Sequence, residues 1–397
     1  MTVALVGLFW ILFAAIAWVY LGFPLLILFK SLWRKPYRKE DVTPHVSLVI
    51  IAYNESAAIG EKLDNILALD YPREKLEIIV GSDGSNDGTD EIVAGYADRG
   101  IRLCSFPRRG KIPALNDAVS LATGEILAFS DANSMFSRDA LRILVRPFAD
   151  PTIGGVAGNQ CYTTSTGNAA SHGEKKYWSF DRILKRLESE SGHTISSTGA
   201  IHAVRREFFA PVPSGVCDDS VISKRVILGG SRLVFEPDAI ASEPVAPSDG
   251  AELARKMRVI TRGLSALWEV RELFNPFQFG FYSFQLFSHK LLRWAAVWLL
   301  LGIFFANAMI LGQGLFYQVF FAAQVLFYVS AIAGCLLRNS SLRRAKAFKL
   351  LAIPYYFCFA NYAALRAWIK LMQGTRWDIW DSKRSSVAGP MAPKVPS

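Results

Sequence analysis

Cysteine is scarce and scattered in this sequence. The five cysteines lie at positions 104, 161, 217, 335 and 358, and no two of them form a C-x-x-C pair. This spacing predicts neither a disulfide framework nor a zinc site, and it suits a reducing compartment. The sequence also lacks internal repeats, and its one biased stretch is a short Ala/Pro/Ser tail.

Charge is absent from residues 3–29, although charged residues make up 20% of the chain. At about 1.5 Å per residue this run is long enough to cross a hydrocarbon core of about 30 Å. The alternative, a cleaved signal peptide, would carry its basic residues before the apolar run rather than after it. We therefore expect a transmembrane helix over residues 1–30. A basic linker over residues 31–44 follows, and its Lys and Arg residues favour the cytoplasmic side.

A second apolar region occupies the C-terminal part of the chain. Residues 271–293 are aromatic but interrupted by polar side chains, which indicates an amphipathic interface helix. Residues 294–372 predict a membrane domain with two clear spans and a third possible one, since residues 350–372 either cross the membrane or lie in its interface. A tail occupies residues 373–397. The net charge of +10 is explained by anionic lipid headgroups next to these segments, so we expect membrane lipids and no nucleic acid as partners.

The middle of the chain, residues 45–270, alternates between short β-branched runs and amphipathic stretches. The runs are VSLVIIAYN, LEIIVGSDG, IRLCSF and EILAFSDAN, and helical patterns lie at 57–69, 88–97, 114–122 and 138–148. Nearly continuous apolar strands are typical of a sheet that is covered on both faces. The alternation therefore predicts an α/β domain with a mainly parallel sheet.

Glycine is missing from the turn after the first of these strands. A dinucleotide site needs a Gly-rich turn there, but the sequence reads AYNES, and a Walker loop is absent as well. Acidic residues follow three strands instead, namely Glu55, Asp83 and Asp131. Ligands of open parallel sheets bind at the carboxyl ends of the strands, so we expect these loops to form one site.

Six segments in this order and spacing carry a resemblance: VSLVIIAYNE, GSDGSNDGT, RRGKIPALNDAV, FSDAN, STGAIHAVRRE and CDDSVISKRVILGG. Together they resemble the membrane-bound inverting family 2 glycosyltransferases, in the subgroup of chitin-oligosaccharide, poly-N-acetylglucosamine, hyaluronan and cellulose synthases. The resemblance implies a GT-A-like nucleotide-diphospho-sugar transferase fold in a cytoplasmic domain at the plasma (inner) membrane. It also implies transfer of a hexose or N-acetylhexosamine from a nucleotide-sugar, expected to be a UDP-sugar. The acceptor is a growing glycan or a lipid-linked acceptor in polysaccharide synthesis.

The resemblance also assigns roles to individual residues. Asp219 is the expected catalytic base, because an acceptor hydroxyl needs a proton acceptor opposite the leaving group. Donor contacts fall on Glu55, Asp83, Arg109, Lys111, Asp131 and Arg258. Mg²⁺ or Mn²⁺ is expected at Asp131 and Asn133, on the interpretation that both lie on one side of an extended segment. Acceptor contacts fall on Thr198, Gly199, Asp218 and Arg262.

Simpler interpretations and departures from the family pattern stand beside these roles. Asp83 and Asp218 also suit helix caps, and Lys111 alone suits a solvated surface charge. Asn133 stands where the family has a second carboxylate, and an amide oxygen brings no charge to a metal. Residues 255–259 keep only Arg258 of the family's Q-x-x-R-W motif, which favours short products.

Two rival functions remain at this point. One is a single-sugar polyprenyl-phosphate glycosyltransferase, and the other is a non-catalytic subunit of a glycan-export complex. Three clear spans are few for a passage of its own, so we also expect a possible companion membrane or export subunit.

Overall fold

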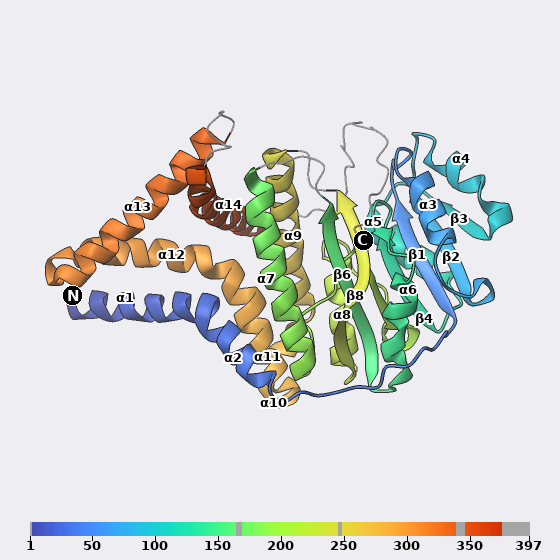
Figure 1. Cartoon of the computed structure of the whole chain (residues 1–397), viewed down its shortest axis with the longest axis horizontal. Coiled ribbons are helices and arrows are strands. Elements are labelled where there is room, and N and C mark those ends of the chain that lie inside the picture. The colour runs from blue at the N-terminus through green and yellow to red at the C-terminus, as the bar shows by residue number, and fades with distance from the viewer. Residues whose placement is uncertain (1, 164–168, 245–247, 339–345, 375–397) are drawn as a thin grey trace.

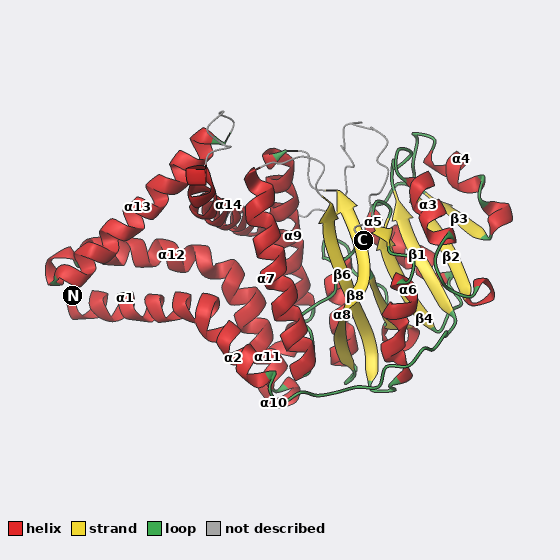
Figure 2. Cartoon of the chain, in the orientation of Figure 1, coloured by secondary structure: helices red, strands yellow, loops and turns green. Residues whose placement is uncertain are grey.

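The computed structural model describes residues 2–163, 169–244, 248–338 and 346–374 (Figure 1). Almost all of the predicted tail, from residue 375 on, lies outside the described residues. Within these ranges a mixed α/β domain occupies one end of the molecule and a group of long apolar helices the other (Figure 2).

The sheet has eight strands in the order β3-β2-β1-β4-β7-β6-β8-β5. Their bounds are β1 Val46–Ala52, β2 Leu76–Asp83, β3 Ile101–Phe106, β4 Ile126–Asp131, β5 Met135–Phe136, β6 Ile153–Thr163, β7 His202–Arg205 and β8 Arg232–Pro244. Strands β1 to β4 pair in parallel, and so do β6 and β8, whereas β7 runs antiparallel to β4 and β6 and β5 antiparallel to β8. The predicted mainly parallel sheet is confirmed.

Helices cover both faces of this sheet. Their bounds are α3 Ile59–Leu67, α4 Thr89–Ala94, α5 Lys111–Ser120, α6 Ala140–Val145, α7 Ala169–Ser191, α8 Asp218–Leu228 and α9 Asp249–Glu269. Ile50 of β1 belongs to one apolar cluster with Leu63 of α3, while its neighbour Ile51 belongs to another with Leu115 of α5 and Ile222 of α8. Because successive strand residues point to opposite faces, α5 and α8 cover the same face of the sheet.

One local sequence prediction is wrong. Strand β4 ends at Asp131, and the next residues form a turn that is closed by a hydrogen bond from Ser134 N to the Asp131 carbonyl, 3.2 Å long. Asp131 and Asn133 therefore do not alternate along an extended segment. The small and polar residues that follow the strand favour this turn.

Among the described residues, three helices are long and apolar enough to cross a membrane: Thr2–Lys30, Phe281–Met309 and Leu315–Leu337. The first comprises α1 Thr2–Ala17, a π-helical turn Trp18–Gly22 and α2 Phe23–Lys30, and the last is α13. Only 17% of the apolar window of the first and 11% of that of α13 are buried in the protein, so most of their apolar surface is left for lipid. Helix α14, Lys346–Met372, contains Pro354, falls outside this set and packs against α13 and α9.

The second of these long helices differs from the sequence prediction. Gly280, with φ 53°, separates the short α10, Pro276–Phe279, from α11, Phe281–Leu286. From Phe281 the chain continues through a π-helical turn into α12, Leu292–Met309. The helix therefore begins after Gly280 and continues past residue 293, where the sequence predicted a boundary between an interface helix and a span.

A buried polar network joins the α/β domain to this long helix. Helices α7 and α9 lie between the sheet and the apolar helices (Figure 1). Glu188 of α7 is fully buried and its Oε1 lies 2.6 Å from Nδ1 of His289. Asp181 lies two turns earlier on the same face of α7, 3.6 Å from Nε2 of the same ring and 3.7 Å from the guanidinium of Arg293. These pairs fix the angle between α7 and the long helix.

Candidate active site

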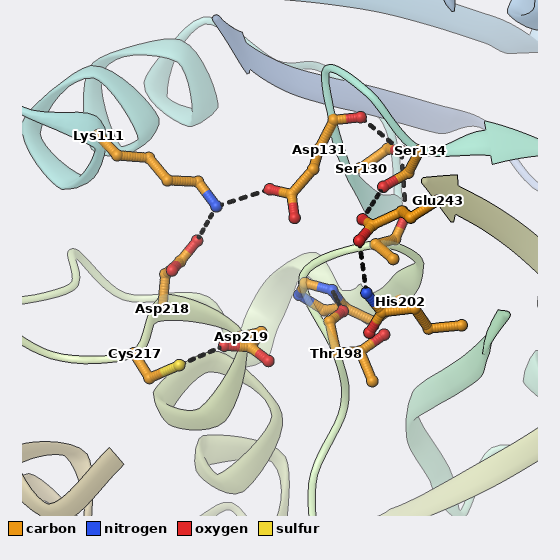
Figure 3. A network of polar contacts seen from close by, with 12 residues as sticks. Lys111, Ser130, Asp131, Ser134, Thr198, His202, Cys217, Asp218, Asp219 and Glu243 are labelled. Atoms are coloured by element: carbon orange, nitrogen blue, oxygen red, sulfur yellow. Dashed lines mark hydrogen bonds and ion pairs between the residues drawn. The ribbon is translucent and has the colours of Figure 1, made fainter. Parts of the chain in front are cut away.

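A single lysine joins two carboxylates at the carboxyl end of the sheet (Figure 3). Lys111 Nζ lies 2.9 Å from Oδ1 of Asp131 and 3.0 Å from Oδ2 of Asp218. Asp131 is the last residue of β4, while Lys111 and Asp218 are the first residues of α5 and α8. Because α5 and α8 cover the same face, their N-terminal ends meet above the end of β4. Lys111 is thus not the solvated surface charge that its sequence position also allowed.

The ion pairs change the protonation behaviour of both helix-terminal residues. Burial alone would lower the pKa of Lys111, but Asp131 and Asp218 outweigh it and raise that pKa above its usual range. Burial alone would raise the pKa of Asp218, but Lys111 and Arg262 outweigh it and lower that pKa to about 2. Lys111 and Asp218 are therefore both charged at neutral pH.

Asp219 follows directly and is only half-buried. Its Oδ1 accepts a hydrogen bond from the thiol of Cys217, with 2.9 Å between Sγ and Oδ1. Burial raises the pKa of Cys217 well above its usual value, and the nearby carboxylates add to this effect, so the thiol keeps its proton and acts as the donor. The Ser197 hydroxyl donates to the Asp219 carbonyl at 2.8 Å, which ties the loop before β7 to α8.

Helix α9 supports the segment that leads into α8. Arg262 donates from Nε to the Val216 carbonyl at 2.8 Å, and its own carbonyl accepts from the backbone N–H of Cys217 at 3.2 Å. Arg262, predicted to contact the acceptor, thus holds the segment that presents Asp219. Arg258 lies one turn earlier on α9 and is half-buried, with interactions of its own.

Asp83 and Arg109 lie at the ends of the neighbouring strands, outside the Lys111 cluster. Asp83 is fully buried, and its carboxylate accepts from the backbone N–H groups of Arg109 at 2.8 Å and Gly110 at 3.0 Å and pairs with Arg108. It therefore anchors the loop that leads into α5. The Arg109 side chain points instead to Asp117.

Glu55 lies after β1 and is 7% exposed. Its backbone N–H donates to the hydroxyl of Thr89 at 2.9 Å, and it also has side-chain interactions. Because β1 pairs in parallel with both β2 and β4, Glu55 lies on the same edge of the sheet as Asp83 and Asp131.

The loop before β7 lies close to Asp131. A Cβ at Gly199 would lie 2.9 Å from Asp131 Oδ2, so a larger residue at this position would displace the Asp131 carboxylate. The Oγ1 atom of Thr198 and the Nδ2 atom of Asn133 are buried and have no hydrogen-bond partner among the described residues. A ligand between these two loops would supply what both atoms lack.

Sequence reasoning missed several residues of this region. Lys62 is fully buried behind the turn after β4, where it donates to Ser130 Oγ at 2.8 Å and to the Ser134 carbonyl. Glu243 accepts from the Ser134 hydroxyl on the same turn. Cys217 stood beside the acidic pair in the sequence, but nothing in the sequence indicated its thiol as a donor to Asp219.

The amino-acid sequence also matches known proteins. Residues 47–211 match the family model described as glycosyl transferase family 2. The poly-beta-1,6-N-acetyl-D-glucosamine synthase of Staphylococcus aureus is 27% identical over 252 residues, which are 62% of this chain and 60% of that protein. Glycosyltransferase AglE of Haloferax volcanii is 28% identical over 57% of this chain and 74% of its own length. The chain carries a family 2 glycosyltransferase domain.

A solved structure extends the similarity beyond this domain. The mannosyltransferase PcManGT of Pyrobaculum calidifontis, in complex with GDP-Man and Mn²⁺, has a TM-score of 0.65 and 26% identity. The match covers 93% of this chain and 100% of that chain, so it includes the apolar helices. The fold is GT-A-like, as the resemblance predicted. The S. aureus synthase, by contrast, is matched over less than two thirds of its length.

Proposed function

We propose that this chain is an inverting glycosyltransferase that moves a sugar from a nucleotide-sugar donor to a glycan or lipid-linked acceptor at the membrane. One observation carries the proposal. Asp131, Lys111 and Asp218 form one charged cluster at the carboxyl end of β4, and the half-buried carboxylate of Asp219 lies beside it. The reaction has two requirements: positive charge that stabilises the departing diphosphate, and a carboxylate base that takes the proton of the acceptor hydroxyl.

The donor side is formed by Asp131, Asn133 and Lys111. Mg²⁺ binds through one or two protein oxygens together with substrate phosphates, so a cluster of three acidic or imidazole ligands is not required. Among the described residues no such cluster exists. The Asp131 carboxylate and the Asn133 amide oxygen fit this minimal ligand set. A bound Mg²⁺ or Mn²⁺ neutralises charge on the departing diphosphate. Lys111, at the first turn of α5, places a cation and backbone N–H groups toward the same phosphates.

The acceptor side is formed by the start of α8. Asp219 takes the proton of the acceptor hydroxyl, while the Cys217 thiol holds one of its oxygens at 2.9 Å. Asp218 is held as a carboxylate by Lys111 and Arg262, and its lowered pKa makes it a weaker proton acceptor than an ordinary aspartate. Attack opposite the leaving diphosphate in one displacement inverts the anomeric carbon.

A second candidate is transfer of a single sugar from a GDP-sugar to a lipid-linked acceptor. The specific support is the match with PcManGT over nearly the whole chain, and that structure contains GDP-Man. The altered motif at residues 255–259 agrees with it. Arg255, where the family motif has glutamine, pairs with Glu252 at 2.8 Å and donates to Tyr162 Oη at 2.8 Å. This candidate differs from the polysaccharide synthesis expected from the sequence, which uses a UDP-sugar, so the donor that the protein accepts distinguishes the two.

The position of the basic residues sets the proposed sidedness. The cations of residues 30–39 directly follow the first apolar helix and precede the α/β domain. By the positive-inside rule the catalytic domain lies in the cytoplasm, where nucleotide-sugars are available.

The test is release of nucleoside diphosphate by the purified full-length protein with a panel of UDP- and GDP-sugars, each with Mg²⁺ or Mn²⁺, followed by product identification. Asp219→Asn is expected to lower turnover at least about a hundredfold and to leave donor affinity within about twofold, because only proton transfer is lost. Asp98→Asn, at an exposed position, is the matched control. Full activity of Asp219→Asn would remove this residue from the base role. No release with any donor in the panel would overturn the proposed function.

A further inference from the structure

His202 lies inside the candidate site, although no role has been assigned to it so far. It is the first residue of β7, is 2% exposed and pairs in register with Phe129 of β4. The two rings stack with 4.8 Å between their centroids and 20° between their planes. Opposed residues of an antiparallel pair point to the same face, and Phe129 shares its face with Asp131 two residues later. The imidazole therefore lies on the face that carries the Lys111 cluster, between Asp131 and Asp219 in the view of Figure 3.

The hydrogen bonds of His202 determine its tautomer. Its Nδ1 lies 2.9 Å from the Thr198 carbonyl oxygen, which can only accept, so Nδ1 carries the proton. Burial lowers the pKa of His202, while Asp219 and Asp218 act against this effect. The ring is neutral, and its Nε2 atom therefore presents a lone pair rather than a proton.

This lone pair has no partner. His202 Nε2 is buried and lacks a hydrogen bond within the described part of the chain, and the same holds for Thr198 Oγ1 and Asn133 Nδ2. A buried polar atom that is left unpaired destabilises a protein. Three such atoms around one carboxylate cluster are best explained by a ligand that pairs with them.

The chemistry of Nε2 limits which groups of a ligand can pair with it. A lone pair repels a phosphate oxygen and needs a donor, which excludes the diphosphate itself as its partner. Mg²⁺ and Mn²⁺ prefer oxygen ligands to an imidazole nitrogen, so the metal proposed at Asp131 and Asn133 is not the expected partner of Nε2. A sugar hydroxyl both donates to an acceptor such as Nε2 and accepts from a hydroxyl such as Thr198 Oγ1.

We propose that His202 Nε2 and Thr198 Oγ1 form a sugar-specificity subsite, in which Nε2 accepts a hydrogen bond from one hydroxyl of a bound sugar. The proposal rests on the proposed transferase function. The hydroxyl belongs either to the transferred sugar of the donor or to the terminal sugar of the acceptor. A sugar that lacks this hydroxyl, or carries it in the other orientation, leaves a buried acceptor unpaired and is rejected.

Two substitutions at one position separate recognition from structure. His202→Asn keeps an amide N–H near the position of Nδ1 for the Thr198 carbonyl but has no atom at Nε2. His202→Gln places an amide oxygen near Nε2 but loses the bond to Thr198. The proposal expects His202→Asn to lower kcat/KM about tenfold or more and His202→Gln to retain more activity than the asparagine variant. A purely structural histidine gives the reverse order, and that result would overturn the proposal.

Binding measurements assign the hydroxyl to its source. If the donor sugar carries it, His202→Asn weakens binding of the nucleotide-sugar about tenfold and leaves binding of the free nucleoside diphosphate unchanged. If the acceptor carries it, donor binding is unchanged and the KM for the acceptor rises. With the wild-type protein, a series of deoxy-sugars is expected to reveal one hydroxyl whose removal lowers kcat/KM about tenfold. The His202→Asn variant is expected to have the same kcat/KM with and without this hydroxyl.

Three outcomes contradict the inference in different ways. Equal activity and binding of His202→Asn and wild type, in a wild-type protein that does transfer sugar, overturns the subsite alone. Equal sensitivity of the wild type and the asparagine variant to every deoxy-sugar does the same. A wild-type protein that neither binds nor turns over any nucleotide-sugar overturns the proposed function and this subsite with it.

Discussion

Replacement of Lys111 by methionine tests the central ion cluster. The methionine chain fills a similar volume but removes the cation that lies 2.9 Å from Asp131 and 3.0 Å from Asp218. Asp218, 8% exposed, is then left in a buried position with Arg262 as its remaining counter-charge. The variant therefore measures how much the cluster contributes to the free energy of unfolding of the substrate-free protein.

The magnitude follows from the protonation of Asp218. Its pKa is about 2 in the folded protein against an ordinary value of 3.8, which corresponds to about 2 kcal/mol at neutral pH. Because the folded pKa is depressed, this stabilisation is fully present above pH 3.8 and is lost as the pH falls through about 2. Asp131 has a side chain that is 34% exposed, so its pair adds less than about 1 kcal/mol. Because Arg262 remains and contributes part of the pKa shift of Asp218, we expect Lys111→Met to lower the free energy of unfolding by about 2 kcal/mol.

The assay is thermal unfolding of the detergent-solubilised full-length chain at several pH values. Asp218→Asn in the Lys111→Met background removes the unpaired carboxylate, so the double variant is expected to recover about 2 kcal/mol relative to the single one. The acid-unfolding midpoint of Lys111→Met should also move to higher pH, since burial then raises the pKa of Asp218. A loss of stability below about 0.5 kcal/mol, or no coupling between the two substitutions, would refute the reasoning.

Three further expectations follow from buried or exposed positions. Burial lowers the pKa of Lys62 from 10.5 to about 7. Between these two pH values the unfolded chain binds more protons than the folded chain, so the free energy of unfolding should rise with pH from about 7 to 10.5. Thermal unfolding of Lys62→Met should lack this rise, which amounts to at most about 1.4 kcal/mol per pH unit. Glu188→Ala leaves His289 without its buried partner and should cost about 3 kcal/mol in the same assay, against less than about 1 kcal/mol for Glu190→Ala, whose side chain is 24% exposed. Val259 is 44% exposed, so Val259→Trp is accommodated and should lengthen the products if this turn of α9 holds the acceptor; unchanged product length in gel analysis would contradict this.

The sequence correctly predicted that three acidic residues lie at one edge of the sheet, because the carboxyl ends of parallel strands meet at the same edge. The apolar strands that precede Glu55, Asp83 and Asp131 had to end on one edge once they paired in parallel, and they do. No comparable rule relates Lys111 to Asp218. Their contact depends on how far the N-terminal ends of α5 and α8 extend over the sheet, which packing decides and local pattern does not.

The turn after β4 shows a different limit of sequence reasoning. Alternation is valid only while the strand continues, and here the hydrogen bond from Ser134 N to the Asp131 carbonyl ends it. A short run of polar and small residues at a strand end fits an extended segment and a turn equally well. The buried Lys62 behind this turn was unpredictable for a related reason, since its helix position looks like that of a solvated lysine until α3 is placed on the sheet.

The same contacts show why the apolar helices matter to a site that lies outside them. Helix α9 holds the segment before α8 through Arg262, which bonds the Val216 carbonyl and the Cys217 N–H, and so sets where Asp219 points. Its other side packs against α14, which in turn packs against α13. The position of the proposed base therefore depends on helix α9, and α9 is held in turn by α14 and, through it, by α13.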